Sequence, residues 1–326
     1  MRARLTRRLM TWAYLAGWAI VRGVPEFLAR GLFRLGADLA WRRGGRGVRR
    51  LSGNLRRVVG PELPESELRV LVRAGLRSYA RYWLEVFRLP VISPKRIVSG
   101  TRTMNAEVLF EAHAAGRGVV VALPHTGNWD HAGAWAVLVG LPFTTVAQRL
   151  EPAALFDRFV AFRKGLGMEV LPLTGGERPV VENLADRLRA GRLVCLLSDR
   201  DLSARGIEVN FFGGRARMPA GPALLSIRTG APLVPVTLSY VGRDWGIRIH
   251  DPVPVPASDG TAGSVTDRVG TMTQQLADAF AQGIAEHPQD WHMLQRLWLD
   301  DVPAGERRGS VTVSDRIADR DVGQAG

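Results

Sequence analysis

The chain has 326 residues, of which 46% are hydrophobic, and it carries a net charge of +13. This length and composition allow a buried core and predict one large domain or two smaller ones. The single cysteine, Cys195, lies inside an apolar run, which excludes a disulfide framework and a cysteine-based zinc site.

The positive charge is concentrated at the N-terminal end. Residues 1–60 contain fourteen arginines against only two acidic residues, Glu26 and Asp38, and the remainder of the chain is nearly neutral. Such an asymmetry indicates an anionic partner for this end, either nucleic acid or an acidic lipid surface. No nucleic-acid-binding motif accompanies the charge, so we expect a membrane surface and no nucleic acid.

Residues 1–90 read as an amphipathic, arginine-rich helical region. The uncharged run at 9–21 is shorter than the roughly 20 residues that a spanning helix needs, and no small-residue cleavage site follows, so neither a spanning helix nor a signal peptide is expected. Aromatic residues interleaved with arginine predict a helix that lies in an anionic lipid interface. The alternative is a pair of core helices with a solvated arginine face. The aromatic residues concerned are Trp12, Trp18, Phe27, Phe33 and Trp41.

Further along the chain, segments of helical and strand character alternate. Apolar residues at three- and four-residue spacing predict helices over 67–89, 105–116, 153–167, 179–191 and 271–288, and Pro222 and Gly230 bound another. Short β-branched runs predict strands over 118–124, 143–148, 168–173, 193–198, 207–212, 232–240 and 245–251. This alternation indicates an α/β fold with a mostly parallel central sheet flanked by helices. We expect the α/β core to span 91–301 and a disordered tail to span 302–326.

The stretch "LPHTGNWDHAGAW" (123–135) follows the first of these strands. In open α/β sheets ligands bind at the carboxyl ends of strands, and His125 lies just past such an end. If His125 is in the strand-to-helix turn and Asp130 is in the first helical turn, the carboxylate can orient the imidazole as a general base. The alternative is a capping arrangement in which Thr126 or Asn128 starts the helix and His125 is a buried polar residue.

No strong nucleophile accompanies this pair. There is no G-x-S-x-G motif, and Cys195 is expected in a strand interior. His131 next to Asp130 would make an unusual metal-ligand set, so no metal site is expected. The pattern therefore indicates a base that acts directly on a substrate hydroxyl, in a group transfer without an enzyme-bound intermediate.

At these residues the chain resembles the membrane acyltransferases with an H-x4-D/E motif, the lysophospholipid and lipid A acyltransferase superfamily. The match is "HTGNWD" (125–130), and within that group the sequence is most similar to the phosphatidylinositol mannoside acyltransferases of mycobacteria and their relatives. The likeness extends over most of residues 1–300. It includes "FRKGLGMEVLPLTGG" (162–176), "SDRDLSARGIEVNFFGG" (198–214), "RMPAGPALLSIRTGAPLVPV" (217–236) and "WHMLQ" (291–295).

The resemblance implies transfer of a fatty acyl group, palmitoyl, from acyl-CoA to a mannose hydroxyl of an anionic phosphatidylinositol mannoside. It implies a peripheral enzyme on the cytoplasmic face of the inner membrane, with acyl-CoA as co-substrate and without a cofactor or metal. The catalytic residues it implies are His125, Asp130 and Asp199. We count Arg163, Asn128, Gln148 and Arg200 as candidate substrate-binding residues.

In the expected mechanism Asp130 orients His125, and Asp199 bonds acceptor hydroxyls or pairs with Arg163. Backbone N–H groups just after the strand are the candidate oxyanion donors. Two alternatives remain: a lipid A-type or lysophospholipid acyltransferase with another acceptor, and a peripheral lipid-binding protein with a degenerate site.

Overall fold

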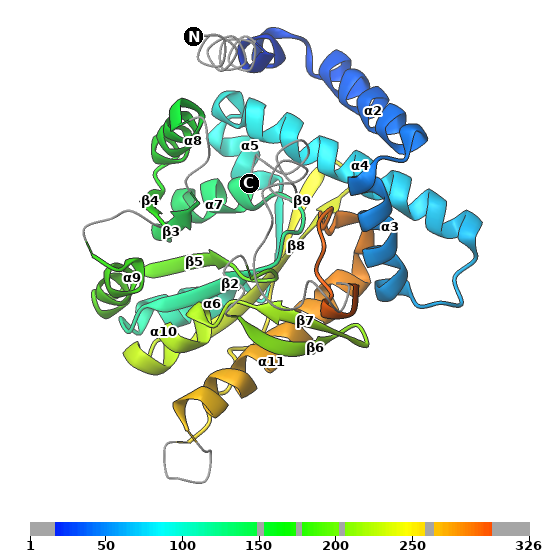
Figure 1. Cartoon of the computed structure of the whole chain (residues 1–326). Coiled ribbons are helices and arrows are strands. Elements are labelled where there is room, and N and C mark those ends of the chain that lie inside the picture. Colours follow the sequence, from blue (N-terminus) through cyan, green and yellow to red (C-terminus); the bar gives the residue numbers. More distant parts are fainter. Residues whose placement is uncertain (1–16, 149–152, 174–177, 202–205, 258–263, 302–326) are drawn as a thin grey trace, which may run out of the picture.

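A seven-stranded, mostly parallel sheet forms the centre of the molecule (Figure 1). The computed structural model describes residues 17–148, 153–173, 178–201, 206–257 and 264–301, so Trp12 and the expected tail at 302–326 lie outside the described residues. Neighbouring strands are parallel except for β8 and β9, which are antiparallel. In spatial order the strands are β1 (Thr101–Met104), β9 (Asp244–Ile249), β8 (Leu233–Val241), β2 (Val119–Leu123), β5 (Leu193–Leu197), β3 (Phe143–Ala147) and β4 (Glu169–Pro172).

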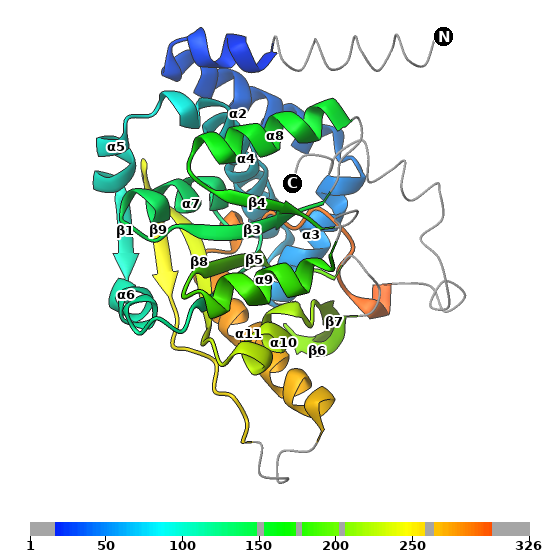
Figure 2. The ribbon, with the colours of Figure 1, turned by 90° about the vertical axis from the view of Figure 1, so that its left-hand side faces the viewer.

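Helices cover both faces of this sheet, as the edge-on view in Figure 2 shows. One face carries α5 (Pro94–Ser99), α6 (Ala106–Ala114), α7 (Trp129–Leu138) and α8 (Ala153–Gly165). The other face carries α9 (Val180–Arg189), α10 (Gly221–Thr229), α11 (Val265–Glu286) and the hairpin of β6 (Ile207–Phe211) and β7 (Gly214–Met218). The predicted mixed α/β fold with a mostly parallel sheet is therefore confirmed.

The central strand β2 illustrates why an unbroken apolar run forms such a sheet. All five of its residues are buried. Val119, Val121 and Leu123 join the core cluster under α7, whereas Val120 and Ala122 join the cluster under α10 and α11. Since successive side chains of a strand point to opposite faces, a strand covered on both faces needs apolar residues at every position.

The N-terminal helices α2 (Glu26–Arg43), α3 (Arg46–Val59) and α4 (Glu65–Arg88) pack beside the sheet. Their shared core consists of Ala37, Leu51, Leu55, Leu68, Val72 and Leu76. Helix α4 also contacts α7 and the short helical turn Pro288–Asp290, so it links the N-terminal helices to the sheet. The two remaining short turns are Leu89–Val91 and Leu299–Asp301. The expected chain division at residues 90 and 301 stays a prediction.

The N-terminal aromatic residues differ from what the sequence predicted. Trp18 does not face outward: it is buried, its indole N–H donates to the carbonyl oxygen of Phe87 at 3.0 Å, and its ring packs against Phe159 and Phe162. Phe33 packs on Phe87, and two arginines of α4 stack over Trp41. Among the described members of the predicted aromatic set, Phe27 alone is exposed, at 72%.

The outward face of α2 is instead aliphatic. Leu28, Leu32, Leu35 and Leu39 are all exposed and recur at helical spacing. Within the described ranges, no helix combines the length and the apolar character that crossing a membrane requires.

Candidate active site

His125 and Asp199 meet because they follow two neighbouring parallel strands by the same distance. Leu123 of β2 lies opposite Leu197 of β5, and His125 and Asp199 each come two residues after this pair. The carboxyl ends of parallel strands lie at one edge of a sheet, where ligands bind in open α/β folds. The expectation that both residues lie at this edge is confirmed.

Asp199, not Asp130, is the carboxylate that contacts His125. The Nδ1 atom of His125 lies 2.6 Å from Asp199 Oδ1, and the His125 backbone N–H donates to Oδ2 at 2.9 Å. The predicted contact between Asp130 and His125 is wrong: Asp130 is in the first turn of α7, as expected, but its carboxylate accepts hydrogen bonds from Tyr82 of α4 and Arg163 of α8. The Asp199 side chain is fully buried, whereas that of His125 is 29% exposed and accessible to a substrate.

The electrostatics of this pair favour an ionised carboxylate. Burial alone would raise the pKa of Asp199, but the nearby His125 and the hydrogen bonds to the carboxylate lower that pKa overall. With Nδ1 held by Asp199, Nε2 is the remaining ring nitrogen, and it makes no hydrogen bond within the described part of the chain. This arrangement of base and orienting acid is typical of general-base catalysis.

The C-terminal segment holds the His125–Asp199 pair, here called the dyad, in position. The indole N–H of Trp291 donates to Asp199 Oδ2 at 3.0 Å, and the backbone N–H of His292 donates to the carbonyl oxygen of His125 at 2.8 Å. The Gly127 N–H donates to the Asp290 carbonyl oxygen at 2.9 Å. Gly127 has φ +53°, and a Cβ atom there would lie 2.9 Å from Leu238 Cβ, so this turn requires glycine.

Asp130 and Arg163 form a second buried pair in the same cavity. Arg163 Nε donates to Asp130 Oδ1 at 2.7 Å, and the Tyr82 hydroxyl of α4 donates to Oδ2 at 3.0 Å. Burial raises the pKa of Tyr82, and the Asp130 charge raises it further, so Tyr82 stays a proton donor. The alternative in which Arg163 pairs with Asp199 is therefore wrong, since Arg163 is on α8 and its partner is Asp130.

Asn128 is a structural residue in this arrangement. Its side-chain oxygen accepts the His131 backbone N–H and caps α7, and its amide donates to Glu85 Oε2 at 2.9 Å. Asn128 is 3% exposed and does not line the cavity, so the prediction that it binds substrate is not supported by its position. The capping that the sequence suggested as an alternative is present at Asn128, but His125 is not a buried polar residue, since its side chain is 29% exposed.

The backbone N–H groups after β2 are also occupied. Those of His125, Thr126 and Gly127 donate to Asp199, Pro124 and Asp290 respectively. The expectation that the N–H groups immediately after the strand serve as oxyanion donors is therefore wrong for these three.

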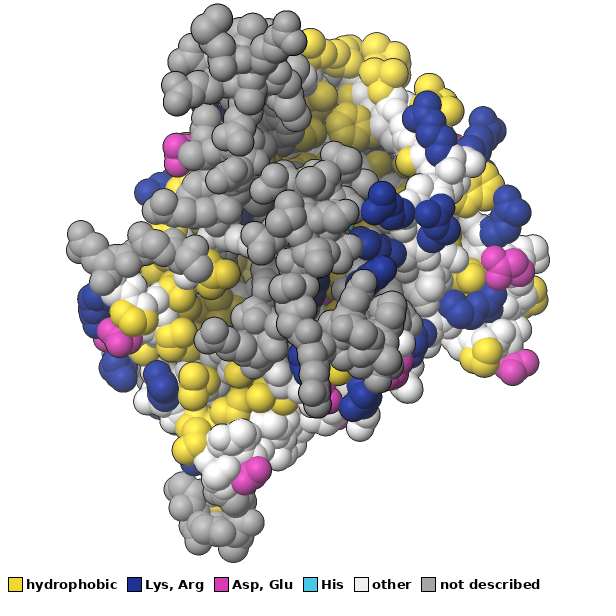
Figure 3. All heavy atoms as spheres, viewed as in Figure 1, with side chains coloured by type: hydrophobic (Ala, Val, Ile, Leu, Met, Phe, Trp, Pro, Cys, Tyr) yellow, Lys and Arg dark blue, Asp and Glu magenta, His cyan; other side chains and the backbone are white. Residues whose placement is uncertain are grey.

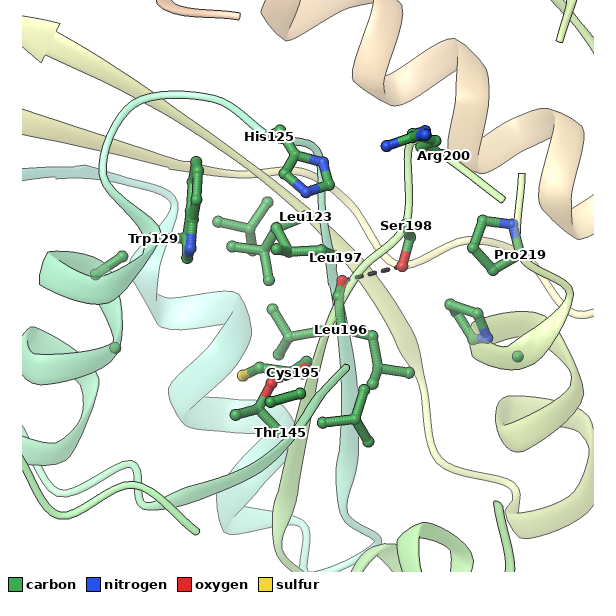
Figure 4. Close-up of a pocket in the computed structure, with 18 of the residues that line it drawn as sticks. Leu123, His125, Trp129, Thr145, Cys195, Leu196, Leu197, Ser198, Arg200 and Pro219 are labelled. Atoms are coloured by element: carbon green, nitrogen blue, oxygen red, sulfur yellow. Dashed lines mark hydrogen bonds between the residues drawn. The ribbon is translucent and has the colours of Figure 1, made fainter. Parts of the chain in front are cut away.

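A cavity of about 880 Å³ opens at the dyad and extends along both faces of the sheet. In Figure 4, Trp129, Cys195 and Thr145 lie on one side of β5, and Ser198 and Pro219 lie on the other, with His125 between them. Arg163, Gln148 and Arg200, which the sequence offered as candidate substrate-binding residues, line the cavity. The apolar lining suits a long hydrocarbon chain. It includes Leu109, Val121, Trp135, Phe143, Met168 and Leu193 on one face and Val180, Leu184, Leu196, Leu224 and Leu225 on the other.

His131 and Cys195, two other residues with side chains that could take part in chemistry, are packed in surroundings that suit a structural role. His131 stacks on Trp245 at 3.8 Å between ring centroids, and burial lowers its pKa to about 3. Burial raises the pKa of the Cys195 thiol, which disfavours the reactive thiolate. In the described ranges, no group of three metal-ligating side chains is close enough to hold an ion.

Sequence reasoning missed three residues that hold the site: Tyr82, Trp291 and His292. Each reaches the dyad or the Asp130–Arg163 pair from a segment far away in the chain. The segment "WHMLQ" (291–295) shows a family likeness in the sequence, but nothing in its pattern indicates a role. An aromatic pair after the last helix carries no local signal that it will contact a carboxylate.

Comparisons with known proteins show which family the sequence matches. The sequence model of the bacterial lipid A biosynthesis acyltransferase family matches residues 1–300. The chain is 50% identical over 298 residues to a phosphatidylinositol mannoside acyltransferase of Mycolicibacterium smegmatis (strain ATCC 700084 / mc(2)155), covering 90% of this chain and 93% of that protein. It is 48% identical over 313 residues to a protein of the same name from Mycobacterium tuberculosis (strain ATCC 25618 / H37Rv), covering 94% of each. The resemblance inferred from the motifs is confirmed.

Proposed function

Because the chain belongs to the bacterial lipid A biosynthesis acyltransferase family, we propose that it transfers a fatty acyl group, palmitoyl, from acyl-CoA to a mannose hydroxyl of a phosphatidylinositol mannoside. The observation that carries the mechanism is the His125–Asp199 pair at 2.6 Å, placed where a long apolar cavity opens. The names of the two relatives support the acceptor.

In the proposed reaction, Nε2 of His125 removes the proton of the acceptor hydroxyl. The hydroxyl oxygen attacks the thioester carbonyl carbon, the new ester C–O bond forms and the C–S bond breaks. The leaving thiolate takes the proton back from the imidazolium and departs as free CoA. Asp199 stabilises the imidazolium and fixes the tautomer with Nδ1–H directed at the carboxylate. No covalent intermediate, cofactor or metal is part of this proposal.

The Asp130–Arg163 pair supports the proposal in a different way. The Arg163 side chain is 13% exposed and lines the cavity, and its charge is balanced by Asp130. Such a pair holds hydrogen-bond donors in fixed positions, and we assign Arg163 to substrate binding, together with Gln148 and Arg200. Asp130 then acts through Arg163 and Tyr82 and does not act on the base.

We place the enzyme peripherally on the cytoplasmic face of the inner membrane. Figure 3 shows hydrophobic side chains gathered over α2, with dark-blue arginine side chains nearby. An exposed aliphatic stripe flanked by exposed arginines suits an interface rich in anionic lipid. Trp18, Phe33 and Trp41 face the molecule and are not outward anchors, and we assign that purpose to the exposed stripe on α2.

Incubation with labelled palmitoyl-CoA and a panel of glycolipid acceptors, read by mass spectrometry, tests the proposal. The H125A variant is expected to lose about 1,000-fold or more in turnover, since general-base catalysis contributes about 10²–10⁴-fold. D199N is expected to lose at least about 100-fold. A matched control is H131F, which replaces a buried histidine outside the cavity and should keep its turnover.

Several outcomes would contradict this proposal. Full turnover by H125A would overturn the mechanism. Acylation of lysophospholipid or of a lipid A-type acceptor in place of the mannoside would favour the alternative acceptors. If the unaltered chain acylated none of them, a degenerate lipid-binding protein would be the better description.

A further inference from the structure

The mouth of the cavity has a basic side formed by α3. Arg46 and Arg50 of this helix line the same cavity as His125, one turn apart on one face. The position of α3 is fixed, because the Asn54 side-chain amide donates to the carbonyl oxygens of Met293 and Gln295 at 2.7 and 3.0 Å. Met293 and Gln295 line the cavity too, so the two arginines are held beside it.

The other arginines of α3 are engaged within the molecule. Arg49 donates to the Gly44 carbonyl oxygen at 2.5 Å, Arg56 to Glu65 Oε2 at 2.7 Å, and the Arg57 guanidinium lies over Trp298. Arg46, by contrast, has no hydrogen bond or ion pair with any residue that the structure describes. It is exposed at the cavity mouth, where it can meet a ligand.

The described carboxylates in and near the cavity make no ion pair with Arg46. Asp130 pairs with Arg163, and Asp199 pairs with His125. The one further acidic residue among the described lining residues is Asp201, which accepts the Gly206 backbone N–H. Arg46 therefore brings to the polar part of the lining a positive charge that no described carboxylate balances, and this charge suits an anion.

We propose that Arg46 and Arg50 form a phosphate-binding site that holds the phosphate groups of a substrate while its apolar part lies in the cavity. Guanidinium groups bind phosphate through paired N–H donors, and the adjoining apolar cavity selects a ligand with both a phosphate and a long hydrocarbon chain. This inference rests on the proposed function. Two substrates there carry phosphate esters, the CoA donor and the glycolipid acceptor, and the experiment below separates them.

Steady-state kinetics with two donors test the site: palmitoyl-CoA and palmitoyl-pantetheine, a thioester without phosphates. For R46Q/R50Q we expect KM for palmitoyl-CoA to rise about 10- to 100-fold, with kcat within about two-fold, since two charge-assisted contacts are lost. KM for palmitoyl-pantetheine should not change. The matched control is R49Q, which removes a charge from the same helix at a position that does not line the cavity.

The single variants R46Q and R46K accompany the double variant. Arg46 is exposed, so R46Q should fold even if the double variant does not, and R46K should restore part of the loss. A rise in KM for the glycolipid, with KM for palmitoyl-CoA unchanged, assigns the site to the acceptor phosphodiester and supports it. If kcat/KM fell equally with both donors while KM for the acceptor stayed unchanged, the proposed phosphate site would be overturned. Unchanged kinetic constants with every substrate would overturn it too.

Binding of free CoA, measured by calorimetry, separates this inference from the proposed function. If no glycolipid were acylated, weaker CoA binding by R46Q/R50Q than by R49Q would still support the site. If instead the variants lost binding to vesicles of anionic lipid but kept their KM values, the arginines would be membrane contacts and the site would be overturned.

Discussion

At the scale of single residues, both carboxylate oxygens of the fully buried Asp199 accept hydrogen bonds. Its two oxygens face three N–H groups: the backbone N–H of His125, Nδ1 of the same residue and the indole N–H of Trp291. A buried carboxylate is costly unless it is paired and hydrogen-bonded, and here both conditions are met. The geometry of the proposed base therefore depends on a tryptophan 92 positions away from Asp199.

Removal of that indole N–H tests this dependence. The W291F variant keeps an aromatic ring in the buried position but leaves Asp199 with one donor fewer. We expect kcat to fall about ten-fold, which corresponds to about 1.4 kcal/mol, with KM for both substrates nearly unchanged. Kinetics and thermal unfolding would be measured on the same samples.

A matched control is W298F. Trp298 is also buried, and its indole N–H donates to Asn54 Oδ1 at 2.9 Å, away from the dyad. Both variants lose one buried hydrogen bond, so they should lose similar stability, while only W291F should lose turnover. Equal losses of kcat would show that Trp291 acts through stability alone.

At the scale of elements, α2 has two distinct faces. Ala29 and Ala37 are buried towards α4, and Asp38 accepts bidentate hydrogen bonds from Arg73 and Arg77 of that helix. The hydrogen bonds from these arginines lower the pKa of Asp38, so the acid stays ionised and ties α2 to α4. The opposite face, with its exposed leucines, is left with no partner among the described residues.

The proposed membrane contact predicts a specific effect of that outer face. L32Q/L35Q removes two leucines that are 64% and 54% exposed, so folding should be unaffected. Binding to vesicles of anionic lipid should weaken about ten-fold or more, because each leucine contributes about 1–2 kcal/mol when its surface leaves water. Sedimentation with vesicles at two salt concentrations measures this.

Val70 of α4 offers the control, since it is 69% exposed but lies outside the α2 stripe. V70Q should bind vesicles like the unaltered chain. Binding by the intact chain should also weaken with added salt, because the arginine contribution is screened. Indifference to lipid charge, or unchanged binding by L32Q/L35Q, would exclude α2 as the contact.

At the scale of the whole molecule, the sequence predicts where helices and strands lie more readily than it predicts which of them pack against one another. The apolar runs of β2 and β5 locate two central strands because burial on both faces leaves a dense local signal. The strand β1, with the sequence "TRTM", was missed because it lies at the sheet edge and is largely exposed, so neither an apolar run nor alternation marks it.

The candidate site shows the same limit. His125 and Asp199 were identified individually, but their contact follows from β2 and β5 being neighbours, and strand order is not encoded in local pattern. Asp130 was paired with the wrong partner for the same reason. Its bond to Arg163 depends on how α8 packs against α7, which is set by the whole core.

The stability of the whole molecule against acid should depend on two buried histidines, His131 and His292. Burial lowers the pKa of each to about 3, with nearby charges adding to the effect, whereas an unfolded histidine has a pKa of about 6.5. Above pH 6.5 both are neutral in either state. As the pH falls towards 3, the unfolded chain binds protons that the folded chain does not, so each histidine lowers the free energy of unfolding by about 1.4 kcal/mol per pH unit.

The H131F variant isolates one of these contributions. Phenylalanine preserves the stack on Trp245, and the hydroxyl of Thr101 still donates to the Ile97 carbonyl oxygen. Between pH 6 and pH 5, the unaltered chain should lose about 1.2 kcal/mol more unfolding free energy than H131F, as measured by urea unfolding. Between pH 7.5 and pH 8.5 the two should change in parallel, because the histidine is then neutral in both states. Parallel curves between pH 6 and pH 5 would mean that His131 takes up a proton in the folded protein, and that its burial against Trp245 does not keep it neutral.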